Sequence, residues 1–451
     1  MKSLCLISAS FVAVLATVGS AFSQTINPPQ QQIALAGSPF AVTTSTDGQY
    51  VFASLSGAAN GIAILKQSRG SATLIRVLPT GGGTFGLTVT RDGRYLLDTV
   101  QPIGNATSPQ GVQIIDIQKA IAGQSNAILG TVPTGDGSGP IEVGLSVDNR
   151  FVFVSNEDQE TVNVIDFANA VASGGSASSI VGAIPVEQLP VGLAFSGNGR
   201  YLYITNEEAN PTDPGYNPAA CNIPNGSGGT SPAPEGTLTV VDVQKAETAP
   251  AQSVLATVYA GCSPVRVVLS QDSEIAWVTA RAADAVLAFS TRALLESGHQ
   301  LPALLSTTPV GTAPVGIQVF DHDRFIAVAN SNRFTSGGTG TVSILDYAKA
   351  LNGTGDAATV GTFTAGEFPR QWALSPDGEY LYLTEFSSNI LAIFPVHALV
   401  KEVSANPYNF RPSFEDKWKR NKKVVTKLLL QERRGLPLAA VHSIHCFPSS
   451  P

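Results

Sequence analysis

The sequence contains few charged residues, few cysteines and few histidines. Charged residues make up 14% of the 451 residues, against about 25% in an average soluble domain. This low fraction excludes a charge-driven disordered chain and a Glu- and Lys-rich coiled coil. Four cysteines are too few for a disulfide scaffold, and a net charge of −7 provides no basic footprint for nucleic acid. We therefore expect a folded protein that does not bind nucleic acid.

Long apolar runs are missing after the N-terminus. Residues 4–18 form an uncharged, largely apolar run behind Lys2, and Ala21-Phe22-Ser23 offers small residues at a cleavage site. This pattern predicts a signal peptide over residues 1–23 and a secreted, extracellular chain that begins at Gln24. The alternative is a membrane anchor, but the run is shorter than the roughly 20 residues that span a bilayer. No later segment is long enough, so no membrane span is expected.

Glycine and proline are abundant instead (43 and 29 residues), and one hairpin pattern recurs along the chain. The clearest copies are residues 368–385 and 189–207. Each is an apolar strand, a Ser-x-Asp/Asn-Gly turn and a strand of alternating aromatic and aliphatic residues. Gly and Asn accept positive φ, so Asp-Gly and Asn-Gly between strands are strong hairpin signals. The same unit recurs around seven turns, at Asp47-Gly48, Asp92-Gly93, Asp148-Asn149, Asn198-Gly199, Asp272-Ser273, His322-Asp323 and Asp377-Gly378.

Further strands follow the hairpins. Third strands are predicted at residues 111–116, 161–166, 237–242 and 341–346, and weaker fourth strands at stretches such as 129–132 and 254–258. Seven units of four antiparallel strands predict an all-β, seven-bladed β-propeller over residues 24–403. A β-sandwich would not repeat one hairpin signature seven times. Blade seven lacks a fourth strand of its own, so residues 31–36 are expected to complete it and close the ring.

The repeats resemble a known family. Tyr201-Leu-Tyr-Ile-Thr-Asn206 and Ser375-Pro-Asp-Gly378 are similar to the repeats of YVTN-type propellers, which are related to the seven-bladed lactonase-like propellers. The resemblance covers residue 31 to about residue 400. It implies the fold and leaves the activity open, because the family includes many non-enzymatic members.

Candidate functional residues gather on one predicted face, which we call the mouth. It carries the loops between second and third strands and between each fourth strand and the next first strand. Carboxylates there are candidate acid/base groups, namely Glu142, Glu157, Glu207 and Glu385. Amides and arginines are candidate ligand contacts, namely Asn156, Asn206, Arg266, Arg281, Asn330, Arg370 and Gln371. The alternative is that the amides cap strands and turns and that the charges pair with each other.

No cofactor or metal is assigned. The five histidines do not map onto the mouth, which disfavours a histidine base or a histidine-rich metal cage there. Lactonising propellers similar to muconate cycloisomerases use a histidine that has no match here. Metal-dependent lactonase propellers use Glu, Asn and Asp, and these residue types are present without a motif. No haem-attachment, P-loop or nucleophile-elbow motif occurs.

The longest predicted loop, Ala209 to Gly236, emerges on the mouth face. It contains Cys221, and Cys262 lies where blade five begins, so a Cys221–Cys262 disulfide is plausible in an oxidising compartment. The alternative is two free thiols. Sequons at Asn105, Asn225 and Asn352 suit an extracellular glycoprotein.

The C-terminal segment differs in charge from the rest. Residues 401–451 carry 10 Lys and Arg against 4 Asp and Glu, whereas the first 400 residues carry 17 against 30. We expect residues 404–451 to be a basic, disordered tail outside the propeller. The alternative is a basic helix that meets a membrane surface or an acidic partner.

Three functions fit these features. The first is a secreted, monomeric, non-catalytic propeller whose mouth binds a polar small molecule, a glycan or an extracellular partner. The second is a lactonase-like hydrolase or cycloisomerase that uses the mouth carboxylates and arginines. The third is a structural cell-surface protein. Convergence of Glu142, Glu157 and Glu207 on one pocket would favour an enzyme, whereas alternating Arg–Glu pairs would favour binding or structure.

Overall fold

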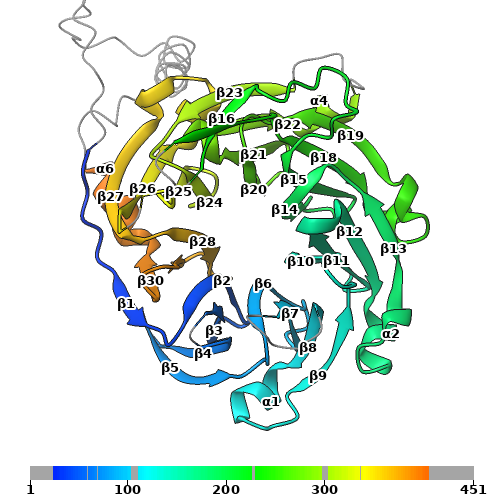
Figure 1. The fold of residues 1–451 in the computed structure, drawn as a ribbon. Helices are drawn as coiled ribbons and strands as arrows, with labels where there is room; N and C mark the ends of the chain where they lie inside the picture. The colour runs from blue at the N-terminus through cyan, green and yellow to red at the C-terminus, as the bar shows by residue number, and fades with distance from the viewer. Residues whose placement is uncertain are drawn as a thin grey trace, which may run out of the picture. The chain divides into compact units, whose positions relative to one another are not determined.

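The computed structural model describes residues 24–57, 59–68, 70–102, 110–225, 229–296, 303–335 and 337–405. These residues form seven four-stranded antiparallel sheets arranged as a β-propeller (Figure 1), as the sequence predicts. The predicted signal peptide, the sequon at Asn105 and all but the first two residues of the predicted tail lie outside the described residues. No described helix is long and apolar enough to cross a membrane.

The first strand of each blade lies nearest the centre of the ring (Figure 1). In blades one to three the strands are β2 (Ser38–Thr44), β3 (Tyr50–Ser56), β4 (Gly61–Ser68) and β5 (Ser71–Leu78); β6 (Gly83–Val89), β7 (Tyr95–Gln101), β8 (Gly111–Asp116) and β9 (Ile128–Pro133); and β10 (Pro140–Leu145), β11 (Phe151–Asn156), β12 (Thr161–Asp166) and β13 (Ile180–Pro185). In blades four and five they are β14 (Gln188–Phe195), β15 (Tyr201–Glu208), β18 (Thr237–Asp242) and β19 (Val254–Tyr259); and β20 (Pro264–Leu269), β21 (Ile275–Ala280), β22 (Ala285–Ser290) and β23 (Leu304–Pro309). In blades six and seven they are β24 (Pro314–Phe320), β25 (Phe325–Asn330), β26 (Thr339–Asp346) and β27 (Thr359–Glu367); and β28 (Pro369–Leu374), β29 (Tyr380–Glu385), β30 (Ile390–Pro395) and the N-terminal β1 (Gln31–Ala34).

The N-terminal strand closes the ring. β1 pairs antiparallel with β30, with Gln31 opposite Ile393 and Ala34 opposite Ile390. The side chain of Gln31 also exchanges two hydrogen bonds, of 2.8 and 2.9 Å, with the backbone of Ala72 in blade one. The predicted closure by the N-terminal strand is therefore confirmed, and the strand spans four residues.

The repeated turn is held by its own side chains. In blade one, Ser45 Oγ donates to Asp47 Oδ1 at 2.6 Å, and the backbone N–H groups of Gln49 and Tyr50 donate to Asp47 Oδ1 and Ser45 Oγ. These bonds to the carboxylate lower the pKa of Asp47. The same Ser/Thr to Asp/Asn bond recurs at Thr90–Asp92, Ser146–Asp148, Ser196–Asn198, Ser270–Asp272 and Ser375–Asp377.

Short helices follow the third strands in most blades. They are α1 (Ile117–Ala122), α2 (Phe167–Ala172), α3 (Val243–Ala246), α4 (Thr291–Glu296), α5 (Tyr347–Leu351) and, after blade seven, α6 (Val396–Ser404). Asp116, Asp166, Asp242 and Asp346 each accept a hydrogen bond from the backbone N–H three residues on, at the N-terminus of a helix. These aspartates therefore cap short helices that were not predicted from the sequence. Single 3₁₀ turns are η1 (Glu157–Gln159), η2 (Ala177–Ser179), η3 (Pro250–Gln252), η4 (Arg281–Ala283) and η5 (Gly355–Ala358).

A hydroxyl on the second strand links each blade to the next in six of the seven junctions. Every first strand has a bulge near its start. In blade five, Thr279 Oγ1 accepts from the bulged N–H of Arg266 at 3.1 Å and donates to Val315 O of blade six at 2.9 Å. Ser54, Thr99, Ser155, Thr205 and Thr384 make the same two bonds in their blades. Ala329 occupies this position in blade six, so no hydroxyl links blade six to blade seven there.

Candidate functional site

Seven equivalent residues lie one at each bulge of the innermost strands. The carbonyl groups of six of them accept the hydroxyl bonds between blades, and the seventh matches that position by register. Six are apolar, and five of these belong to one buried cluster that Phe85 packs against; the set is Phe40, Phe85, Ile141, Val191, Val265 and Val315. Arg370 takes the seventh position, in blade seven. Arg370 is thus the one charged residue at these seven equivalent positions.

A cavity of about 340 Å³ lies beside Arg370. Its described lining is of two kinds. Six residues are apolar and five are charged; they are Phe40, Ile141, Val191, Val265, Phe368 and Phe386, and Glu157, Glu207, Arg281, Arg333 and Arg370. A volume at the small end of the usual 300–1,000 Å³ range suits a small ligand.

The guanidinium of Arg370 has no ion-pair partner among the described residues. Arg370 is 7% exposed, and its Cζ lies 3.4 Å from the centroid of the Phe40 ring. Burial and the neighbouring positive charges of Arg266 and Arg333 hold the pKa of Arg370 well below its usual range. This direction means that the charge is poorly compensated, so an anion in the cavity would stabilise it.

Two of the predicted carboxylates are paired with arginines. Arg281 donates from Nη1 to Glu207 Oε1 at 2.9 Å and from Nη2 to Glu207 Oε2, and Ser263 Oγ donates to Glu207 Oε2 at 3.2 Å. Arg266 Nη2 lies 3.2 Å from Glu142 Oε2, with both side chains 9% exposed. Burial raises the pKa of Glu142, and the charge of Arg266 opposes this. The mouth therefore contains two Arg–Glu pairs, one between blades four and five and one between blades three and five.

Glu157 is the carboxylate on the cavity wall that forms no ion pair among the described residues. It begins η1, directly after β11, and is half-buried. Burial and the negative charges of Glu207 and Asp158 raise the pKa of Glu157, while Arg370 and Arg281 oppose the shift. Of the three glutamates proposed to converge, Glu157 and Glu207 line the cavity, whereas Glu142 faces Arg266 beside it.

The predicted amide contacts have a different position. Asn156 and Asn330 end their second strands, and Asn206 holds the equivalent position in β15, two residues before its end. Each Nδ2 donates two hydrogen bonds to side chains of the following third strand. Glu385 takes the equivalent place in blade seven, is fully buried and has a pKa raised by burial. Neither these four residues nor Gln371 is among the described residues that line the cavity.

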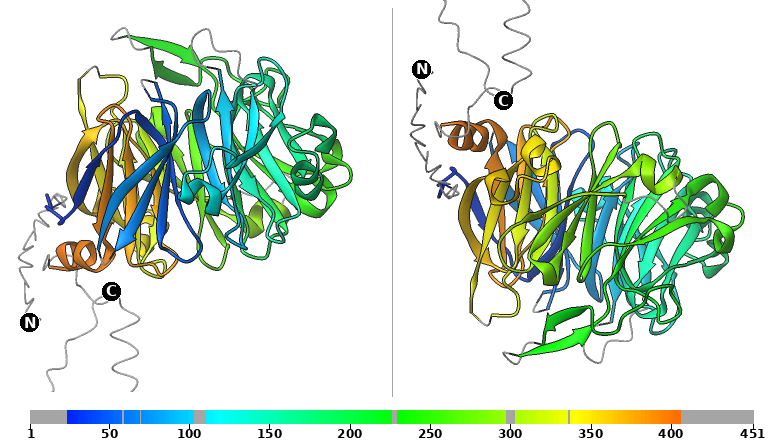
Figure 2. Two further views of the ribbon diagram at one scale, coloured as in Figure 1. Left: turned by 90° about the horizontal axis from the view of Figure 1, so that it is seen from below. Right: turned by 90° about the horizontal axis from the view of Figure 1, so that it is seen from above.

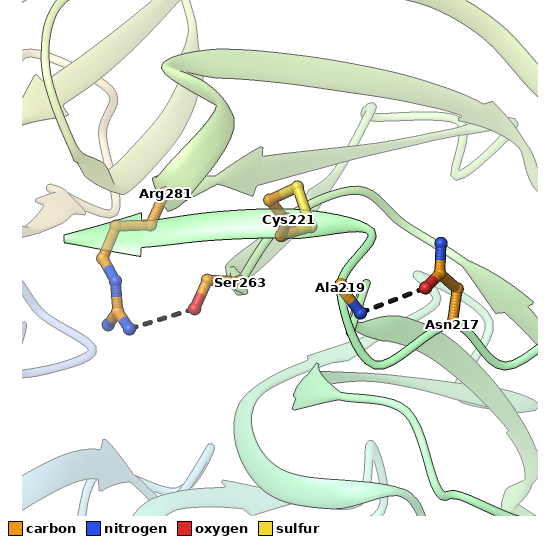
Figure 3. The surroundings of a disulfide bond; sticks show 6 residues. Asn217, Ala219, Cys221, Ser263 and Arg281 are labelled. Carbon is orange, nitrogen blue, oxygen red and sulfur yellow. Dashed lines mark hydrogen bonds between the residues drawn. A yellow bond between two sulfur atoms is a disulfide. The ribbon is translucent and has the colours of Figure 1, made fainter. Parts of the chain in front are cut away.

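The predicted disulfide between Cys221 and Cys262 is confirmed, with the two Cα atoms 5.7 Å apart. Cys221 begins β16 (Cys221–Pro224), which pairs with β17 (Thr230–Ala233) in a hairpin that projects from one face of the ring (Figure 2). In Figure 3, Arg281 reaches toward Ser263, the residue after Cys262, close to the disulfide. The bond closes a 41-residue separation, worth about 4 kcal/mol in the chain-entropy model. It fastens the loop beside the Arg281 wall of the cavity.

Seven lining residues were not among the candidates predicted from the sequence, namely Phe40, Ile141, Val191, Val265, Arg333, Phe368 and Phe386. Phe40 lies in β2, Phe368 directly precedes β28, and Phe386 directly follows β29. Arg333 lies in a loop, three residues beyond the end of β25. Arg333 is exposed and stacks over Phe368, with its Cζ 5.0 Å from the ring centroid. Alignment of the first strands would have revealed Phe40, because Pro39-Phe40 matches Pro369-Arg370.

Comparisons with known proteins support the fold alone. No protein-family model and no curated protein matches the chain. Hydrazine synthase from Kuenenia stuttgartiensis is similar with a TM-score of 0.57 and 18% identity, over 81% of this chain and 97% of that chain. The Cps50 (Swd1) β-propeller domain from Myceliophteria thermophila has a TM-score of 0.55 and 13% identity, over 82% of this chain and 100% of that chain. At these identities, the likeness extends to the propeller architecture and to no activity.

Proposed function

We propose that this chain is a secreted, non-catalytic propeller of the YVTN type that binds a small organic anion in the mouth cavity. A propeller is consistent with a binding or interaction role. The observation that supports an anion is Arg370, a buried guanidinium on the cavity wall with no ion-pair partner among the described residues. An anion placed there would form charge-assisted hydrogen bonds away from bulk water.

The pairing of the glutamates favours binding over acid/base catalysis. Glu207 and Glu142 each form an ion pair with an arginine, so neither carboxylate is free to act on a ligand. Glu157 then remains as a lone candidate base, without the second carboxylate that a shared-proton mechanism needs. This arrangement of Arg–Glu pairs is the one that the sequence analysis associated with a binding or structural role.

Secretion is supported by the predicted signal peptide and by the disulfide, because disulfides persist in oxidising compartments. Asn225 and Asn352 are exposed, as glycan acceptors must be. N-terminal sequencing of the protein from culture medium should begin at Gln24.

Isothermal titration of the purified protein with small carboxylates tests the proposal. We expect binding to the wild type and at least a tenfold loss in Arg370→Gln. Arg292→Gln is the matched control, because that side chain is 82% exposed on α4. Equal binding by all three proteins would refute the proposal. Turnover of a lactone panel, abolished in Glu157→Gln, would favour the enzyme instead.

A further inference from the structure

The lining of the mouth cavity carries information about the ligand beyond its charge. None of the described lining residues is Ser, Thr, Asn or Gln, so every side chain there is either charged or apolar. A ligand rich in neutral hydroxyl groups would find no neutral side-chain partner on these walls. The composition suits a molecule with one charged end and one apolar end.

The charges indicate one negative charge on that molecule. Arg281 and Glu207 neutralise each other through their two-pronged contact. Arg370, Arg333 and Glu157 remain, which leaves one excess positive charge when Glu157 is ionised. A monoanion balances the cavity.

The apolar part of the wall is aromatic and lies next to the buried cation. The Phe386 ring is 5.3 Å from Phe368 and 6.3 Å from Phe40, measured between centroids. Arg370 stacks over both Phe40 and Phe368, at 3.4 and 5.4 Å from their centroids. If a ligand ring packs against these phenylalanines, an acid group attached a few bonds from that ring can reach the Arg370 guanidinium. Aromatic pairs in edge or offset contact contribute more than their buried area alone, a contribution that a saturated ring lacks.

We infer that the ligand is a carboxylate attached closely to one aromatic ring. The inference rests on the proposed function, because both use Arg370 as the anion partner. The cavity volume of about 340 Å³ has room for an aromatic ring and its acid group. Ile141, Val191 and Val265 supply the rest of the apolar wall.

Four probes separate the parts of this inference in titrations of the full secreted protein. Benzoate carries ring and charge, cyclohexanecarboxylate carries charge on a saturated ring, acetate carries charge alone, and benzyl alcohol carries the ring alone. We expect benzoate to bind at least tenfold more tightly than acetate or benzyl alcohol, and several-fold more tightly than cyclohexanecarboxylate. Phe386→Leu should weaken benzoate by about 2- to 10-fold and leave acetate unchanged.

The outcomes distinguish this inference from the proposed function. If acetate or cyclohexanecarboxylate binds as tightly as benzoate, the aromatic ligand is wrong and the anion site stands. If benzyl alcohol matches benzoate, or if no carboxylate binds, both are wrong. Phe386 is half-buried in a turn after β29, so its replacement should preserve the fold. An unchanged unfolding temperature in Phe386→Leu confirms this, and Arg292→Gln again serves as the control.

Discussion

Replacing Arg370 with leucine should make the propeller more stable while it abolishes anion binding. Six equivalent positions around the channel are apolar, so leucine restores the pattern of the ring at the seventh. The buried guanidinium has no ion-pair partner among the described residues, so burying its positive charge costs free energy that no carboxylate offsets directly. Replacing buried charged groups by apolar residues of similar volume often stabilises a protein, by about 1–4 kcal/mol.

The expected gain is smaller than the upper end of that range. Glu142 and Glu157 each lose a nearby positive charge in the variant, so we expect a gain of about 1–2 kcal/mol in the free energy of unfolding. At roughly 2.1 cal/mol/K for each residue, a propeller of about 380 residues has an unfolding entropy near 0.8 kcal/mol/K. The unfolding temperature should then rise by about 1–3 °C.

Scanning calorimetry of the ligand-free protein at neutral pH measures this shift. Arg370→Lys keeps the charge and should show no such gain, so it separates charge burial from packing. A fall of the unfolding temperature in Arg370→Leu would refute the reasoning, because Arg370 would then be a structural residue. Stability gained together with unchanged carboxylate binding would refute the assignment of Arg370 as the anion partner.

Three further changes test other features. Thr279→Val removes one buried hydrogen bond within blade five and one between blades five and six, and should cost about 1–3 kcal/mol in the free energy of unfolding. Ala329→Ser should instead raise the unfolding temperature by supplying the missing hydroxyl. Calorimetry that shows the two variants shifting the unfolding temperature in the same direction would contradict the role of these bonds. Burial holds the pKa of Asp98 well above its usual value, so stability should fall by about 1.4 kcal/mol per pH unit once the pH exceeds the unfolded pKa and level off above the folded pKa. Asp98→Asn should abolish this fall, and parallel melting curves across pH would disprove it. Because the pKa of Glu157 is raised, benzoate should bind more tightly as falling pH protonates Glu157, and Glu157→Gln should bind tightly without this dependence; titrations between pH 5 and 8 check it.

The propeller could be predicted because its signals are local. The turn around Ser45 and Asp47 is held by bonds within six residues, so the same residue types reveal it in six of the seven copies. Closure by β1 followed from counting strands, since blade seven lacked one. The short helices were missed because a segment such as Phe167–Ala172 is too short to show a 3.6-residue period.

The site could be predicted only in part because its contacts join distant residues. Glu207 and Arg281 were placed on the correct face from their strand ends, yet their pairing spans 74 residues and depends on the contact between blades four and five. Arg333 lies in a loop that has no repeat pattern. The sequence therefore predicts which charged residues lie on the mouth, but it does not predict which residue each of them pairs with.

Repetition separates structural residues from functional candidates more clearly than residue type does. Asn156, Asn206 and Asn330 recur at one position and make the same bonds, as expected of a residue that serves the blade. Arg370 and Ala329 are exceptions within their own repeated positions, and both lie at one junction. By register, the hydroxyl missing at Ala329 is the one that would bond to the Arg370 carbonyl. The junction between blades six and seven thus lacks a link found at the other six, and it is the junction that carries the uncompensated charge. Departure from the repeat at these two adjacent positions is the reason to place the binding function there.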